Sequence, residues 1–317
     1  MTLFKVIENS MMKHMVVVMM AMCFCFELQA QSSDTAAIRF MDNAPDYRPA
    51  RGRWVGAGLA AGYAGTMSAL YATWYRDYPM GKFHGFNDNN EWLQMDKVGH
   101  AGSVYYLSRW TSGLIRWTGK NDRASAVLGT GSAWLFLLTI EVFDGFSSQW
   151  GFSSGDLLAN TAGAGLYLGQ QLGWKEQRIT FKYSYHKDPI ADLRPGTFGK
   201  DLSENVLKDY NGQTYWLSAN IHSFLPDKAI PSWLNLTLGY GAGGMITAEK
   251  NVVLDNGIID PGTRFRQFYL SPDIDLSRIP VRSKSLKLLL NAVGFIKFPM
   301  PAIEFNPDGI KFHPLYF

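Results

Sequence analysis

The chain has 317 residues, a formal net charge of +3 and a charged fraction of 18%. A charge this small, without a basic cluster interleaved with aromatic residues, excludes nucleic acid as the expected partner. Charged residues fall below the quarter or so that is usual in soluble domains, which favours a protein that contacts lipid or buries much of its surface.

Residues 1–30 have the order of an export signal. Lys5 and Lys13 precede the apolar run 15–26, and small residues follow before a plausible cleavage point. The apolar run is too short for a comfortable membrane span. We therefore expect an exported protein whose mature chain begins near Gln31.

Both cysteines of the chain, Cys23 and Cys25, lie inside this predicted signal. Their sequence context fits a lipidation site poorly. If the signal is cleaved, the mature chain has no cysteine, so neither disulfides nor thiolate metal sites contribute to it.

After a polar lead over residues 31–53, charge-poor stretches predict an apolar four-helix up-and-down bundle over residues 54–175. The first stretch carries no charged side chain, is long enough to cross a bilayer, and contains glycines on which a second helix could approach closely. Turns rich in Gly, Asn and Asp separate the stretches. The predicted helices run over residues 54–75, 96–117, 124–143 and 154–174.

The pattern changes past Lys175, and residues 176–317 are predicted to form a strand-rich C-terminal region. Leu234–Tyr240 alternates between apolar and polar residues, which is the period of a half-buried strand. The predicted fold class is thus α+β, with an antiparallel strand-rich half that has one apolar face. The predicted strands run over residues 179–185, 214–224, 234–240 and 265–276.

Ionisable groups border the predicted helices at positions that up-and-down connectivity brings to one end of the bundle. Glu141 follows seventeen uncharged residues, so its desolvation requires a partner. Asp144 lies near a helix C-terminus, where the helix dipole disfavours an anion. The candidate binding residues are Asp96, Lys97, His100, Glu141, Asp144, Ser154, Asp156 and Asn160, and the candidate catalytic residues are His100, Glu141 and Asp144.

Each candidate also has a structural interpretation. Asp96 could cap a helix, Ser153 with Asp156 fits part of a capping box, and Lys97 could pair with a nearby carboxylate. The acidic surplus invites a cation, either a metal or an amine-bearing ligand, although Lys97 can neutralise part of it. We expect no cofactor, with a divalent cation as the alternative.

A family resemblance appears at these residues. The run Glu91–His100, then Glu141 with Asp144, then Ser153–Asp156 with Asn160 resembles the YfiM-like family of predicted periplasmic lipoproteins of unknown function. The tail run 208–218 is similar to long members of that family from Bacteroidetes. A looser similarity is to VanZ-like membrane proteins, which share the Asp-Lys-x-x-His start.

Three functional hypotheses follow. The preferred one is an exported cell-envelope protein that is structural or interacts with membrane lipid. The second is an envelope hydrolase or transferase in which His100 acts as acid and base beside Glu141 or Asp144. The third is an accessory subunit whose strand-rich half docks to an outer-membrane protein.

Charge placement bears on location. Basic residues at the opposite end of the predicted bundle would place the site outside an inner membrane, whereas a cleaved signal implies the other orientation. We therefore expect the periplasm or the outer membrane, with the inner membrane as the alternative.

Overall fold

The computed structural model describes residues 40–76, 79–225, 229–249 and 263–317. The predicted signal over residues 1–30, with Cys23 and Cys25, lies outside this part. The chain divides into two compact units, Met1–Phe86 with Leu107–Ser154 and Asn87–Tyr106 with Gly155–Phe317. This division differs from the expected one into residues 54–175 and 176–317. The expected division remains a prediction.

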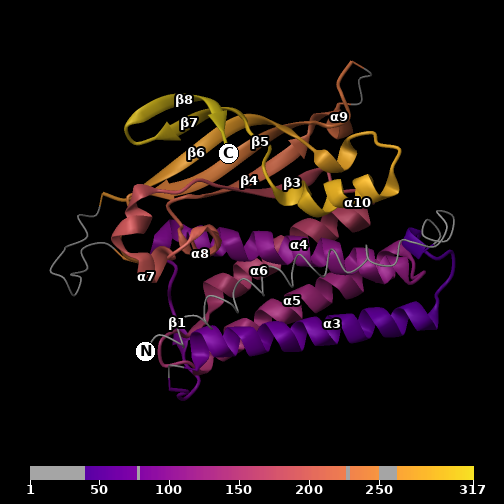
Figure 1. The fold of residues 1–317 in the computed structure, drawn as a ribbon, viewed down its shortest axis with the longest axis horizontal. Helices are drawn as coiled ribbons and strands as arrows, with labels where there is room; N and C mark the ends of the chain where they lie inside the picture. Colours follow the sequence, from indigo (N-terminus) through magenta and orange to yellow (C-terminus); the bar gives the residue numbers. More distant parts are fainter. Residues whose placement is uncertain (1–39, 77–78, 226–228, 250–262) are drawn as a thin grey trace. The chain divides into compact units, whose positions relative to one another are not determined.

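The first unit is built on two long helices. α3 (Pro49–Leu70) continues into a π-helical turn, η1 (Tyr71–Tyr75), and α5 (Asp122–Phe146) is capped by the side chain of Asn121. The rings of Tyr63 and Phe136 lie 5.8 Å apart, so α3 runs alongside α5 (Figure 1). Two short strands, β1 (Gly85–Phe86) and β2 (Phe152–Ser153), pair in parallel.

Helix α4 (Met95–Trp117) contributes to both units, and α6 (Ser154–Gly173) belongs almost entirely to the second. The four predicted helices are therefore present, with ends displaced by a few residues. Because they are divided between two units, a single four-helix up-and-down bundle is not confirmed. In the described part of the chain α5, and not the first predicted helix, is long and apolar enough to cross a membrane.

In the second unit, glycine lets α4 and α6 approach each other closely. A Cβ added at Gly163 would lie 2.0 Å from the carbonyl oxygen of Ala101, which no rearrangement of a flexible side chain could relieve. The rings of Tyr105 and Tyr167 lie 5.9 Å apart along the same contact. Gly165, two residues further along α6, has open space at the corresponding position.

This contact predicts opposite effects for two neighbouring substitutions. Gly163→Ala forces backbone apart and should lower the free energy of unfolding by about 1 to 3 kcal/mol. Gly165→Ala should leave it unchanged or raise it by up to about 1 kcal/mol, because alanine favours helix. Urea unfolding of both variants measures the difference. Equal effects would mean that α4 and α6 are not in backbone contact.

The rest of the second unit is a six-stranded antiparallel meander with the order β3-β4-β5-β6-β7-β8 (Figure 1). Its strands are β3 (Ile179–Tyr185), β4 (Gln213–Asn220), β5 (Leu234–Gly243), β6 (Phe265–Ile274), β7 (Met300–Asn306) and β8 (Gly309–Tyr316). Short helices connect them: α7 (Pro195–Phe198), α8 (Leu202–Lys208), α9 (Ile221–Phe224) and α10 (Lys284–Ala292). Single 3-10 turns complete the unit: η2 (Glu91–Gln94), η3 (Pro189–Leu193), η4 (Leu276–Arg278) and η5 (Val293–Phe295).

The strand prediction was right for β3 to β6 and wrong in two places. The predicted strand 214–224 ends at Asn220, whose side chain caps α9 by accepting from the Ser223 amide at 3.0 Å. β7 and β8 were missed, although the turn between them, Asn306–Gly309, is a strong hairpin signal. There Asn306 accepts from the Asp308 amide, and Gly309 adopts φ 124°.

The sheet curls strongly around a polar interior. Lys182 on β3 contacts Asp273 on β6 at 2.6 Å, although three strand spacings of about 4.8 Å separate these strands in a flat sheet. Thr214 on β4 contacts the hydroxyl of Tyr316 on β8 at 3.0 Å across the same concave side. The buried face of the sheet is thus its polar face.

The opposite, convex face is apolar. The start of α4 packs on it at Phe181 and Tyr215, and beyond that contact it is largely exposed as far as β8. This reverses the usual arrangement, in which an antiparallel sheet packs its apolar face on the core and solvates its polar face. The exposed residues are Leu217, Leu236, Leu238, Phe268, Ile303, Phe305, Ile310 and Phe312. We call this set the convex apolar face.

Candidate functional site

The second unit contains one lysine surrounded by carboxylates. The ammonium of Lys97 lies 2.7 Å from Asp88, 2.8 Å from Asp96 and 2.9 Å from Asp156. All four side chains are at most 14% exposed, so the charges depend on each other rather than on water. The sequence prediction that Lys97 pairs with a nearby carboxylate is confirmed. We call these four residues the Lys97 cluster.

An unusual turn precedes the cluster. Trp92, Leu93 and Gln94 all have positive φ, a conformation that costs roughly 1 to 2 kcal/mol for each non-glycine residue. The Trp92 amide donates to Ala248, and the Tyr240 hydroxyl donates to the carbonyl of Leu93. These tertiary bonds hold the turn between the loop that carries Asp88 and the first turn of α4.

Asp96 lies inside the first turn of α4, because the helix already begins at Met95. The structure therefore does not support the interpretation of Asp96 as the helix cap. Its carboxylate still benefits from the helix dipole at this end, and it accepts a hydrogen bond from Lys97.

The cluster shifts the titration of its members. Burial by itself lowers the pKa of Lys97, but hydrogen bonds and charge from the three carboxylates outweigh it, so the pKa is raised above its usual value. Burial raises the pKa of Asp156, against the opposing effect of His100 and Lys97. Burial together with Asp88 and Asp96 likewise raises the pKa of the neighbouring Glu91.

The carboxylate oxygens of Asp88, Asp96 and Asp156 lie within 4.8 Å of one another, a spacing that could hold a metal ion. The ammonium of Lys97 already occupies the centre of this group. A divalent ion would have to displace it, and a metal centre remains only a prediction.

His100 and Asn160 adjoin the cluster, as predicted. Nδ1 of His100 lies 3.3 Å from the side-chain oxygen of Asn160, which can only accept a hydrogen bond. Nε2 of His100 lies 3.9 Å from Asp156, beyond hydrogen-bond distance. Asn160 is fully buried, whereas the His100 side chain is 25% exposed. This arrangement suits a structural polar network as well as it suits a reacting site.

The remaining candidates belong to the first unit. Glu141 is 1% exposed and accepts from the backbone amide of Ser153 at 3.4 Å, which confirms that it is buried with a partner. The hydroxyl of Tyr75 donates to Asp144 at 2.6 Å. Ser154 is exposed at the start of α6. The predicted convergence of these residues with His100 and Lys97 remains a prediction.

Two participants, Asp88 and Tyr75, were not among the candidate site residues, although charge placement puts Asp88 at the same end of the predicted bundle as the site. Asp88 lies in a loop rich in Gly, Asn and Asp, where an acidic residue is unremarkable. Tyr75 ends a helical run and carries no charge pattern that would indicate a partner at Asp144. No local pattern identifies either contact, because each joins positions set by tertiary structure.

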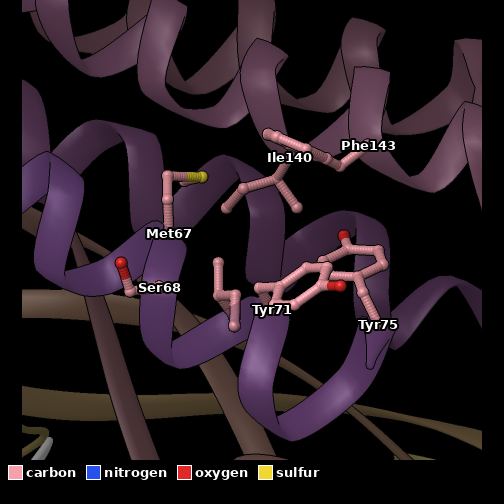
Figure 2. A pocket seen from close by; sticks show the side chains of 7 residues that line it. Met67, Ser68, Tyr71, Tyr75, Ile140 and Phe143 are labelled. Carbon is pink, nitrogen blue, oxygen red and sulfur yellow. The ribbon is translucent and has the colours of Figure 1, made fainter. Parts of the chain in front are cut away.

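The first unit also contains an apolar groove of about 300 Å³ where η1 meets α5 (Figure 2). Figure 2 shows Met67, Tyr71 and Tyr75 facing Ile140 and Phe143 across it. The ring of Tyr75 lies 5.9 Å from that of Phe143. Its lining is mainly apolar, so it fits an apolar chain better than a polar ligand.

Residues 84–169 match the family described as "Predicted periplasmic lipoprotein (DUF2279)". The matched segment contains the Lys97 cluster, His100, Glu141 and Asp144, and it supports a periplasmic location for the protein. No curated protein and no solved structure matches the chain. The finer resemblances to YfiM-like and VanZ-like proteins remain predictions.

Proposed function

We propose that the protein is an exported cell-envelope protein with a structural, lipid-interacting role. The match to a periplasmic lipoprotein family over residues 84–169 is compatible with this role. The specific part of the proposal, contact with lipid, rests on the surface of the first unit.

The observation that carries the proposal is the low burial of α5. This helix is long and apolar enough to cross a membrane, yet only 33% of its most apolar stretch is buried. A core helix of similar composition is mostly buried, and large exposed apolar patches mark interaction sites. Its large apolar side chains that are more than a third exposed are Val127, Leu128, Leu135, Val142, Phe143 and Phe146.

The neighbouring helix extends this surface. α3 contains no buried residue, and no charged side chain occurs between Trp54 and Tyr75. The groove beside Tyr75 and Phe143 lies on the same helix pair and offers space for part of an acyl chain. Lipid tails satisfy such a surface without requiring directional contacts.

Under this proposal the Lys97 cluster is a structural element that ties the loop at Asp88 to the starts of α4 and α6. The hydrolase or transferase with His100 beside Glu141 or Asp144 remains an alternative hypothesis. The accessory subunit that binds an outer-membrane protein is the other alternative.

Vesicle flotation with one charge substitution tests lipid contact. Leu135 on α5 is 57% exposed, and Leu202 on α8 is 69% exposed, so both leucines can be replaced by lysine without opening a cavity. On zwitterionic phosphatidylcholine vesicles, Leu135→Lys should bind about a hundredfold more weakly than the parent, since a lysine in hydrocarbon costs about 3 kcal/mol. Leu202→Lys should bind like the parent.

Both variants share one N-terminus, so an uncleaved signal cannot explain a difference between them. A parent chain that stays at the bottom of the gradient would contradict the proposed function. So would equal binding of the two variants, because lipid contact would then not involve α5.

A further inference from the structure

We propose that the convex apolar face of the second unit is a separate lipid-contact surface, whose occupant is the acyl chains of a phospholipid membrane. This inference extends the proposed function, and rests on it, by adding a surface outside the α3–α5 pair. The observation behind this inference is that the sheet buries its polar face and exposes its apolar face.

The concave side holds the charges that would otherwise have faced solvent. Lys182, Asp273 and Lys297 are each at most 1% exposed and lie together, with Asp273 2.6 Å from Lys182 and 3.9 Å from Lys297. Glu304, on β7, is 3% exposed and contacts His313 on β8 at 2.7 Å. A sheet that buries charged side chains and exposes leucine and phenylalanine is unfavourable in water. The same arrangement is favourable in lipid.

The register shows that the apolar residues form one continuous surface. Leu217 pairs with Leu238, which pairs with Leu270, which in turn pairs with Ile303. Ile303 then pairs with Phe312, so one row of aliphatic and aromatic residues crosses β4 to β8. A parallel row runs through Tyr240, Phe268, Phe305 and Ile310. No charged residue lies within either row. Arg266 borders the second row and donates a hydrogen bond to the Tyr240 hydroxyl at 3.2 Å.

The face has room for a chain at its margin. A hollow of about 430 Å³ lies where the start of α4 meets the sheet, lined by Val98 and Ala101 from the helix and by Phe181, Leu238 and Phe268 from the strands. Its surface is almost wholly apolar. It continues onto the convex apolar face through Leu238 and Phe268.

Acyl chains explain this surface better than a protein partner does. Non-obligate interfaces with other proteins are on average no more apolar than the remaining protein surface and carry about one hydrogen bond per 100–200 Å². The two rows described above offer side chains that, apart from Tyr240, make no hydrogen bonds. Lipid tails need none.

Adjacent positions on β8 provide a matched test. Phe312 belongs to the convex apolar face, whereas Lys311 pairs in register with the inward-facing Glu304 and is itself exposed. In a full chain carrying Cys23→Ser and Cys25→Ser, single cysteines are introduced as Phe312→Cys, Leu238→Cys or Lys311→Cys and labelled with the fluorophore NBD. Phosphatidylcholine–phosphatidylglycerol vesicles are then added, with and without nitroxide on the acyl chains.

The labels at positions 238 and 312 should shift to the blue and be quenched by acyl-chain nitroxide, while the label at 311 should do neither. The same result in a Leu135→Lys background would show that this face meets lipid independently of α5. Labels at 238 and 312 that behave like the one at 311, on a chain that still floats, would overturn the inference and leave the proposed function standing.

Two further outcomes also overturn it. A blue shift without vesicles that grows with protein concentration would show that a second copy of the chain covers the face. A parent chain that does not bind vesicles at all would remove both the inference and the proposed function. Circular dichroism of each labelled variant verifies that the strands are intact.

Discussion

Replacing Lys97 by methionine is expected to lower the free energy of unfolding by about 3 to 5 kcal/mol. The substitution keeps most of the side-chain volume but leaves the carboxylates of Asp88, Asp96 and Asp156 close together without their cation. Urea or thermal unfolding measures the loss. The matched control is Lys187→Met, which breaks an exposed pair with Asp192 and should cost less than about 1 kcal/mol.

The pH dependence gives this prediction a definite sign. Burial already raises the pKa of Asp156, and removing the lysine raises the pKa of this carboxyl further. A carboxyl whose pKa is higher in the folded than in the unfolded chain binds more protons when folded, so lowering the pH stabilises the fold. The deficit of Lys97→Met relative to the parent should therefore shrink as the pH falls from 7 toward 5.

A second substitution separates charge from packing. Lys97→Met combined with Asp156→Asn should be less destabilised than the sum of the single effects, because fewer like charges remain in contact. Strictly additive effects, together with a deficit that does not change with pH, would mean that the Lys97 cluster does not hold this part of the chain together.

The largest effect in the sheet is expected from Asp273→Asn, which should also cost about 3 to 5 kcal/mol. Asp273 is fully buried, contacts Lys182 and Lys297, and accepts from the hydroxyl of Ser218 at 2.7 Å. The isosteric change leaves two buried ammonium groups without their anion. Near-UV circular dichroism can follow unfolding, because Trp216 lies in the same interior.

Here the pH dependence runs in the opposite direction. Burial lowers the pKa of Lys297 to about 8, against the raising effect of Asp273. Without Asp273 the pKa of Lys297 falls further. At pH values above this lowered pKa the unfolded chain binds more protons than the folded chain, so the free energy of unfolding rises with pH. The deficit of Asp273→Asn should shrink between pH 7 and 9. Asp308→Asn, at an exposed position beside Lys311, should stay within about 0.5 kcal/mol of the parent at every pH.

A loss in Asp273→Asn that is no larger than in Asp308→Asn would contradict the charged interior. It would also weaken the inference about the convex apolar face, because that inference requires charged residues to be buried on the concave side of the sheet.

Much of the secondary structure follows from local sequence. Long runs without charged residues predict the helices, because a long apolar segment must be removed from water and a helix satisfies its backbone hydrogen bonds internally. Alternation in Leu234–Tyr240 predicts a strand because successive side chains point to opposite faces. The hairpin around Asn306–Gly309 carried an equally local signal, and proline at positions 301 and 314 obscured the strands on either side.

The candidate site was only partly predictable. The sequence offered a pair of Lys97 with a nearby carboxylate as the structural interpretation of this residue, and the structure confirms it. The sequence did not identify Asp88, which reaches the lysine through the left-handed turn at Trp92–Gln94. It also did not identify Tyr75 as the partner of Asp144. Ion pairs between distant positions depend on loop paths that no local pattern encodes.

The face of the sheet that is buried was decided only by tertiary structure. The period of two in β5 determines that Leu236 and Leu238 share one face and that Asn235 and Thr237 share the other. It does not determine which face turns inward, because the alternation is identical in both cases. Curling of the sheet brought Lys182 on β3 against Asp273 on β6, although two strands lie between them, with the polar side inward and the leucines outside.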